Sequence, residues 1–333
     1  MRLPYHKITK AFIAALLIAS GCKKENPDEE VNYTLTPYSI NYPAYFPDLI
    51  IPETNPLTVE GIQLGRKLYY DPILSNTGLS CSSCHEKSSS FSMYSINSLP
   101  HINLGWNSNF LWNGKISGSL EDIMRFEVEE FFSTDVSKLN NSSEYLALFK
   151  KIYGVDNITS KEVAYALAQF FRYLTSFNSP FDKFANHEIT LSSSELNGFV
   201  IFNTEKGDCF HCHSLGLFTD NKFHNNGLDS TYSGVNMGRY NVTGNPADIG
   251  AFKSPTLRNI EFTAPYMHDG RFTTLEEVVE FYNSQVKFSS TVDPIMTKPS
   301  KEFGLQLTPT EKTDLVNFLK TLSDSSFINN PNY

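Results

Sequence analysis

Two short stretches of the 333-residue chain share one pattern, Cys81-Ser-Ser-Cys84-His85 and Cys209-Phe-His-Cys212-His213. C-x-x-C-H is the attachment site of c-type haem, because two thiols add to the haem vinyl groups and the adjacent histidine reaches the iron. A split four-cysteine zinc site, a thioredoxin-like dithiol and two disulfides are alternatives, but none explains a histidine after both pairs. The pattern therefore predicts two covalently bound haem c groups.

The fifth cysteine lies at the end of an N-terminal export signal. Residues 1–10 are basic, and residues 11–20 are a small, apolar run, shorter than the about 20 residues that span a bilayer. The small residues before Cys22 resemble a bacterial lipoprotein signal, in which residues 1–21 are removed and Cys22 is acylated. An ordinary secretory peptide with an incidental cysteine is the alternative. We expect residues 22–40 to form a disordered tether, since they begin with a charged, Pro-containing segment.

The composition describes an acidic globular protein. Hydrophobic residues make up 40% and aromatic residues 14% of the chain, and the formal net charge is −9. Such a charge argues against binding to the phosphate backbone of nucleic acids. Together with the export signal, it predicts a protein on the periplasmic side of a bacterial membrane or on the cell surface, which contacts the membrane only through its lipid.

An internal duplication follows the two haem motifs. Residues 103–115 (NLGWNSNFLWNGK) mirror residues 259–271 (NIEFTAPYMHDGR), and each copy continues into a helix that Ser119 or Thr274 opens. Both helices carry acidic residues in their first turn, as capping and the helix dipole favour. The duplication predicts two related haem domains.

Helical periodicity dominates the rest of the chain. Capping boxes begin at Thr159 and Thr308, each followed by an apolar stripe, whereas runs of period two are scarce. We therefore predict a mainly α fold with long irregular loops and two cytochrome c-like haem domains, residues 41–188 and residues 189–333.

The chain resembles the bacterial dihaem cytochrome c peroxidase family, including its MauG branch, which oxidises a partner protein. The resemblance covers residues 57–322 and rests on residues 64–72 (LGRKLYYDP), 110–114 (FLWNG), 254–259 (SPTLRN) and 263–270 (TAPYMHDG). It implies an enzyme that reduces hydrogen peroxide to water with electrons from a small redox protein, a cytochrome c or a cupredoxin, and it is compatible with a homodimer. A MauG-like oxidase that modifies a protein side chain and a non-enzymatic dihaem electron carrier are alternatives.

The resemblance makes the N-terminal haem the peroxidatic one, with His85 as its proximal ligand. Family members place a glutamate on the opposite face, where it moves a proton between the peroxide oxygens. The segment 130–135 (EFFSTD) matches the context of that glutamate and implies Glu130, with Glu129 as the alternative. A solvated charge run that also includes Glu127 is the non-functional interpretation.

The ligands opposite the proximal histidines follow from the same resemblance. The loop whose histidine blocks the first haem in many members is missing, so we expect a five-coordinate iron there, with His101 as an alternative distal ligand. At the second haem His213 is proximal, and Tyr282 lies seventeen residues after Pro265, where MauG has a tyrosine and other members a methionine. Met267 is the alternative ligand, and no protein ligand is a third possibility. Phenolate favours higher oxidation states of iron, and thioether raises the potential.

Two further roles are implied between the haems. Trp112 occupies the position of a tryptophan that relays electrons, although a packing role is the alternative. Asn97, Thr263 and Pro265 match the residues that hold a calcium ion at the domain junction in the family, and oxygen ligands of these types suit calcium.

Overall fold

The computed structural model describes residues 33–333 except residues 96, 300 and 303. The predicted export signal and Cys22 lie outside the described residues. The chain divides into two units, residues 1–34 and residues 35–333, and the second unit contains both C-x-x-C-H motifs. None of the described helices is both long and apolar enough to cross a membrane.

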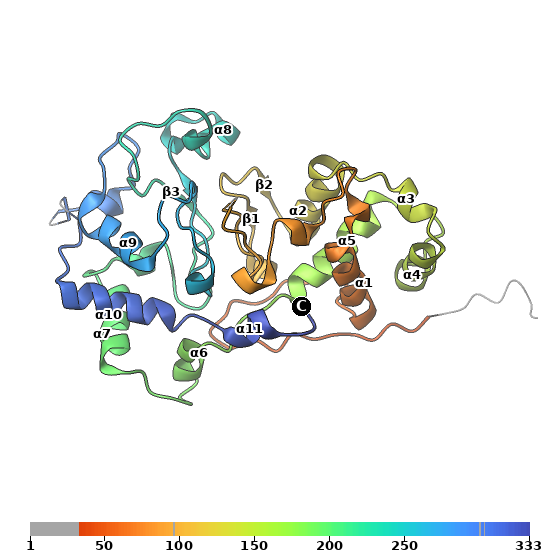
Figure 1. The fold of residues 1–333 in the computed structure, drawn as a ribbon, viewed down its shortest axis with the longest axis horizontal. Coiled ribbons are helices and arrows are strands. Elements are labelled where there is room, and N and C mark those ends of the chain that lie inside the picture. Colours follow the sequence, from red (N-terminus) through yellow and green to blue (C-terminus); the bar gives the residue numbers. More distant parts are fainter. Residues whose placement is uncertain (1–32, 96, 300, 303) are drawn as a thin grey trace, which may run out of the picture. The chain divides into compact units, whose positions relative to one another are not determined.

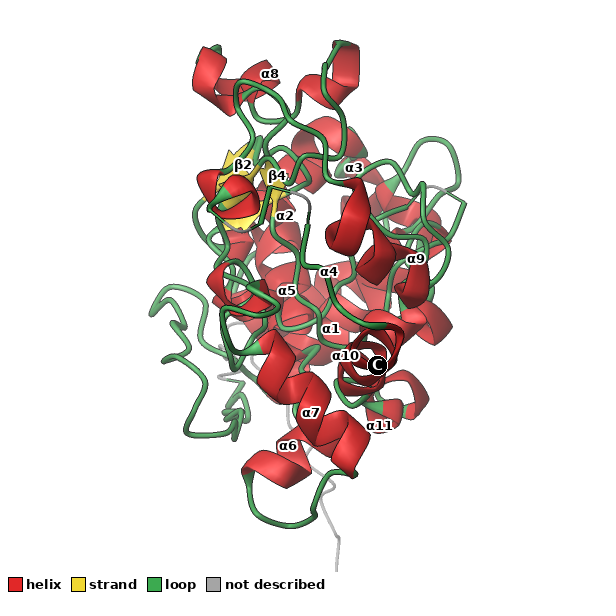
Figure 2. Cartoon of the chain, turned by 90° about the vertical axis from the view of Figure 1, so that its left-hand side faces the viewer, coloured by secondary structure: helices red, strands yellow, loops and turns green. Residues whose placement is uncertain are grey.

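The second unit is mainly helical, as predicted (Figures 1 and 2). Two small antiparallel pairs, β1 (Asn109–Phe110) with β2 (Ile116–Ser117) and β3 (Phe223–His224) with β4 (Phe252–Lys253), accompany the helices. The α-helices of the described residues are α1 (Val59–Tyr70), α2 (Leu120–Phe126), α3 (Ser137–Asn140), α4 (Ser143–Tyr153), α5 (Ser160–Tyr173), α6 (Pro180–Ala185), α7 (Ser193–Phe202), α8 (Tyr240–Thr243), α9 (Leu275–Glu280), α10 (Pro309–Lys320) and α11 (Ser325–Asn329).

Local capping sets the starts of the helices that were predicted from sequence. Thr159 and Thr308 form reciprocal capping boxes at the starts of α5 and α10. Ser119 and Thr274 do the same for α2 and α9. Each cap pairs backbone N–H groups that would otherwise lack a partner, which is typically a gain of about 1 kcal/mol.

The duplication extends to the way the helices cross. Gly65 of α1 lies so close to α5 that an added Cβ would be 2.0 Å from the carbonyl oxygen of Ala166. Gly198 of α7 has the same relation to α10, where an added Cβ would be 2.0 Å from the carbonyl oxygen of Asp314. Only glycine permits this approach, so the two helix pairs are repeated versions of one crossing.

Two hydrophobic cores accompany the two haem motifs. The first core contains residues from Leu57 to Leu174, and the second contains residues from Phe181 to Leu322. The chain therefore passes from the first core to the second between residues 174 and 181, whereas the predicted domain boundary lies between residues 188 and 189. The chain also returns to the first core at its end, because Phe327 and Tyr333 are buried there.

Residues 35–40 of the predicted tether are folded. Leu35, Tyr38 and Ile40 pack against the first core, and the amide of Tyr38 donates to the carbonyl of Leu57 at 2.9 Å. Residues 35–40 therefore belong to the folded unit, because these apolar side chains interrupt the polar segment and find a partner surface that the linear sequence does not reveal.

Candidate functional site

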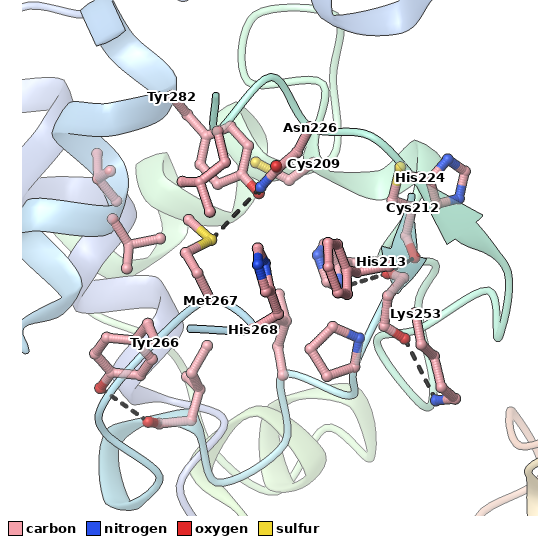
Figure 3. Close-up of a pocket in the computed structure, with 18 of the residues that line it drawn as sticks. Cys209, Cys212, His213, His224, Asn226, Lys253, Tyr266, Met267, His268 and Tyr282 are labelled. Carbon is pink, nitrogen blue, oxygen red and sulfur yellow. Dashed lines mark hydrogen bonds between the residues drawn. The ribbon is translucent and has the colours of Figure 1, made fainter. Parts of the chain in front are cut away.

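The C-terminal motif lines a cavity of about 230 Å³. Cys209 and Cys212 contribute to its wall next to a 3₁₀ turn (Cys209–His211), and His213 follows directly. Figure 3 shows His213 facing the interior, with Tyr282 and Met267 on the other side.

His213 is held in the orientation that a metal ligand needs. Its Nδ1 lies 3.0 Å from the carbonyl oxygen of Phe218, which leaves Nε2 as the free ring nitrogen. Burial lowers the pKa of His213 to about 4, although the Phe218 carbonyl opposes this effect. The ring is therefore neutral at physiological pH, and a neutral imidazole with a backbone partner on its other nitrogen suits iron. With two free thiols beside it, the site fits a covalently attached haem c.

Both predicted candidates for the opposite ligand lie in this cavity. The amide nitrogen of Asn226 is 3.1 Å from the hydroxyl of Tyr282 and 3.5 Å from the sulfur of Met267. Burial raises the pKa of Tyr282 to about 12, and the bond from Asn226 opposes this rise. The position of Tyr282 is compatible with ligation, and the choice between the two side chains stays a prediction.

The N-terminal motif repeats the arrangement around its histidine. Cys81 is buried, and Nδ1 of His85 lies 2.7 Å from the carbonyl oxygen of Phe91. Burial lowers the pKa of His85 to about 4. His85 thus has the same neutral, backbone-oriented ring as His213, and this site fits a second haem c.

His101 lies against the face of the His85 ring. The two imidazole rings stack, with centroids 3.5 Å apart and an interplanar angle of 21°. Histidines that bind opposite faces of a haem iron direct ring edges toward the metal from two sides and cannot lie face to face. This stacking supports the expectation that His101 is not the distal ligand.

The three neighbouring glutamates differ sharply in their environment. The side chain of Glu130 is 65% exposed and forms an ion pair with Lys115, and Glu129 is 41% exposed and pairs with Arg125. Glu127 is largely buried, and this burial raises its pKa to about 7. The carboxylates of Glu130 and Glu129 are both directed to solvent and to surface cations.

Glu127 also has the right position in the duplication. It lies eight residues after the cap Ser119, just as Tyr282 lies eight residues after the cap Thr274. Helix α2 continues as a π-helical turn at Glu127–Phe131, and α9 continues as one at Phe281–Gln285. Glu127 therefore corresponds to Tyr282, which lies in the C-terminal cavity. Counting from both caps would have found it from sequence.

The charge of Glu127 acts on the N-terminal motif. The pKa of the Cys81 thiol is raised mainly by burial and further by the negative charge of Glu127. A partly buried carboxyl with a pKa of about 7 can either accept or donate a proton at physiological pH.

Trp112 connects the two halves of the unit. Its indole Nε1 donates to the carbonyl of Asn97 at 3.1 Å, and its own carbonyl accepts from the amide of Lys253 at 2.8 Å. Trp112 also lines the C-terminal cavity. Its counterpart in the duplication is His268, which stacks on Phe252 with centroids 3.6 Å apart.

The predicted calcium ligands come together in part. The side chains of Asn97 and Pro265 both lie within 3.5 Å of the point that a Cβ at Gly270 would occupy. The amide of Asn97 donates to the carbonyl of Met267 at 2.6 Å, and Thr263 lines the same cavity as Asn97. The calcium site stays a prediction.

Two C-x-x-C-H motifs, each with a partly buried histidine held by a backbone carbonyl, define the class of dihaem c-type cytochromes. The family model for di-haem cytochrome c peroxidase matches residues 59–190. The methylamine utilization protein MauG of Methylorubrum extorquens is 35% identical over 295 residues, which cover 81% of this chain and 80% of that protein.

Other relatives agree with this assignment. The cytochrome c551 peroxidase of Nitrosomonas europaea is 31% identical, with 82% of this chain and 83% of that protein covered. The crystal structure of a MauG-like protein associated with microbial copper homeostasis has a TM-score of 0.80 and 30% identity, covering 89% of this chain and 98% of that one. The chain belongs to the di-haem cytochrome c peroxidase family, which includes MauG, and is an oxidoreductase of that family with two haem c groups.

Proposed function

We propose that this protein reduces hydrogen peroxide to water at its N-terminal haem site, with electrons that a small redox protein delivers to the C-terminal site. The observation that carries the proposal is the partly buried carboxyl of Glu127, whose charge acts on Cys81, combined with a His101 ring that stacks on His85. Bound at His85, a haem iron would supply an open position for peroxide.

Glu127 holds and moves the proton in this proposal. Reduction of peroxide requires a proton to leave one oxygen and another to reach the departing oxygen. A carboxyl whose pKa is about 7 exchanges protons readily in both directions near neutral pH. Glu130, which was the expectation from sequence, is reassigned to the surface ion pair with Lys115.

Trp112 is the proposed electron relay between the two sites. It lines the C-terminal cavity and reaches the N-terminal half through Asn97, so an indole lies on the path that joins the motifs. A cytochrome c or a cupredoxin would supply electrons from outside, and the negative charge of the chain favours a donor with a basic face.

A MauG-like oxidase that modifies a protein side chain is the second candidate. Tyr282 in the C-terminal cavity supports it, because a buried phenolate ligand stabilises high oxidation states of iron. The non-enzymatic electron carrier needs a ligand opposite His85, and the stacking of His101 on His85 argues against His101 in that role.

The remaining expectations from sequence join the proposal. Cys22 would carry a lipid that anchors the protein on the periplasmic side of a bacterial membrane or on the cell surface. Asn97, Thr263 and Pro265 would hold calcium, and a homodimer is compatible with the family assignment.

The decisive experiment measures peroxide consumption by the dihaem protein with reduced cytochrome c or cupredoxin as donor. Oxidation of two donor molecules for each peroxide supports the peroxidase. Peroxide consumption without donor oxidation, together with a mass change in a partner protein, supports the oxidase instead. Two low-spin ferric haems and no reaction with peroxide would support the electron carrier.

A further inference from the structure

The carbonyl group that orients His85 belongs to a strained loop. Nδ1 of His85 lies 2.7 Å from the carbonyl oxygen of Phe91, at the end of the first proximal loop (residues 86–91). Ser90 and Phe91 both have a positive φ, 55° and 58°, which residues with a side chain adopt at a cost in energy. Such a conformation persists where the surrounding structure holds it. The first proximal loop therefore needs an anchor that keeps its carbonyl on His85.

The corresponding loop behind His213 is less strained. Nδ1 of His213 lies 3.0 Å from the carbonyl oxygen of Phe218, at the end of the second proximal loop (residues 214–218), and Phe218 has a φ of 53°. The other positive φ of this loop, 94°, belongs to Gly216, and glycine adopts it freely. The first proximal loop contains no glycine. It is therefore the loop that depends more on support from outside.

Asn259 of the C-terminal half supplies this support. Its side-chain amide donates to the hydroxyl oxygen of Ser90 at 2.7 Å, and both residues are fully buried. The Oδ1 atom of Asn259 accepts from the amide of Asp324 at 2.6 Å, and its own backbone amide donates to the carbonyl of Leu322 at 3.0 Å. Asn259 is thus fixed by the chain at residues 322–324, so it can hold Ser90 in place.

The duplication shows how this contact differs from its counterpart. Asn103 corresponds to Asn259 and has a similar left-handed φ, 53° against 59°. Its side-chain amide donates to the carbonyl of Ser176 at 2.9 Å, and its Oδ1 accepts from the amide of Ser176 at 2.8 Å. Asn103 therefore holds backbone groups with both ends of its side chain, whereas Asn259 directs its amide to the hydroxyl of the first proximal loop.

The segment that carries Asn259 also supports the other proximal histidine. The amide of Leu257 donates to the carbonyl of Phe218 at 3.2 Å, which is the carbonyl beside Nδ1 of His213. Two residues of one short segment, Leu257 and Asn259, thus contact the supports of both histidines. The second support is held by a backbone bond, and the first is held through the Ser90 side chain.

We propose that Ser90 is a positioning residue for His85: its bond to Asn259 keeps the Phe91 carbonyl on Nδ1 and thereby lowers the reduction potential of the haem that His85 binds. A hydrogen-bond partner on the other ring nitrogen makes a histidine ligand more basic, and a more basic ligand stabilises ferric iron. The inference goes beyond the proposed function, because it concerns a potential and holds for any reaction at this haem.

The test is a redox titration of the dihaem protein, in which Ser90→Ala and Ser90→Gly are compared with wild type. We expect the equilibrium constant for reduction of the N-terminal haem to rise about tenfold, as for loss of a partner behind a metal-bound histidine. This change is about 59 mV for a one-electron couple. The potential of the C-terminal haem should stay nearly unchanged, because the Phe218 carbonyl keeps its bond from Leu257.

A spectroscopic readout reports the same bond without any reaction. The iron–histidine stretching band in the resonance Raman spectrum of the ferrous protein should move to lower frequency in both Ser90 variants, because a weaker partner makes His85 a weaker ligand. Ser90→Gly guards against a folding defect in Ser90→Ala, since glycine adopts the φ of Ser90 at no cost. It still removes the hydroxyl and leaves Phe91 at its positive φ, so the carbonyl should still lose its position.

Ser289→Ala is the matched control. The buried hydroxyl of Ser289 also accepts an asparagine amide, that of Asn225 at 3.2 Å, but it belongs to the C-terminal half. This variant should leave the potential of the N-terminal haem unchanged. A potential and a stretching band equal to wild type in both Ser90 variants would overturn the proposal, as would an equal shift in Ser289→Ala. Peroxide consumption is measured separately, so its absence would refute the proposed function and not the role of Ser90.

Discussion

Glutamine in place of Glu127 removes a partly buried carboxylate whose charge acts on the N-terminal haem motif, and it keeps the shape of the side chain. Burial raises the pKa of Glu127 to about 7, so about one carboxyl in 100 is ionised at pH 5. If the ionised form accepts the proton of peroxide, the wild-type rate should fall about tenfold for each pH unit below 7. Glu127→Gln should lower the rate at pH 8 by about 10²–10⁴-fold and remove this pH dependence.

The assay is rapid mixing of the ferric dihaem protein with peroxide from pH 5 to pH 9. Glu130→Gln is the matched control, since its carboxylate is exposed and its ion pair with Lys115 is worth little. Its rate should stay within about twofold of wild type. The reasoning fails if Glu130→Gln is the slow variant, or if Glu127→Gln retains both the rate and the pH profile.

Stability supplies an independent check on the same residue. The pKa of Glu127 is higher in the folded than in the unfolded state, so the folded state binds more protons between pH 4.5 and pH 7. The contribution of Glu127 to the free energy of unfolding therefore falls as the pH rises from about 4.5 to about 7. Glu127→Gln should therefore raise the melting temperature at pH 8, where the free energy of unfolding should increase by up to about 3 kcal/mol. The same change should have little effect on the melting temperature at pH 4. A lower melting temperature at pH 8 would contradict the burial argument.

Three further predictions concern the haem ligands. Cys84→Ala and Cys212→Ala should each weaken covalent attachment at one site, and mass spectrometry of the mature wild type should show two haem additions, fewer than two being the contrary result. The ferric protein should react with peroxide without prior reduction, because His101 stacks on the proximal histidine; activity only after half-reduction would show that a side chain blocks the iron. Tyr282→Phe should raise the potential of the second haem and alter its ferric spectrum, whereas Met267→Leu should change neither, and the reverse pattern in spectroelectrochemistry would make the methionine the ligand.

Those features that depend on neighbours in sequence could be predicted without a structure. The haem attachment residues are contiguous because the two thioether bonds and the iron ligand must come from one turn of the chain. The caps at Ser119, Thr159, Thr274 and Thr308 were predictable for a similar reason, since each side chain bonds an amide only three residues away. The mainly helical class followed from the period of the apolar residues.

Tertiary structure alone decided which charged and aromatic groups are removed from water. The count from the caps singles out Glu127 within the run of three glutamates, but only the packing of α2 and its π-helical turn partly buries it while leaving Glu129 and Glu130 to surface cations. The stacking of His101 on His85 joins two loop segments whose mutual approach has no sequence pattern.

The ends of the folded unit were decided in the same way. Residues 35–40 and the C-terminal Phe327 and Tyr333 pack on the first core from opposite ends of the described chain. Whether a side chain is buried depends on the surface it packs against, and that surface forms only when segments distant in sequence come together. Sequence by itself therefore determined where the haems attach, and the tertiary structure decided which side chains surround the two motifs.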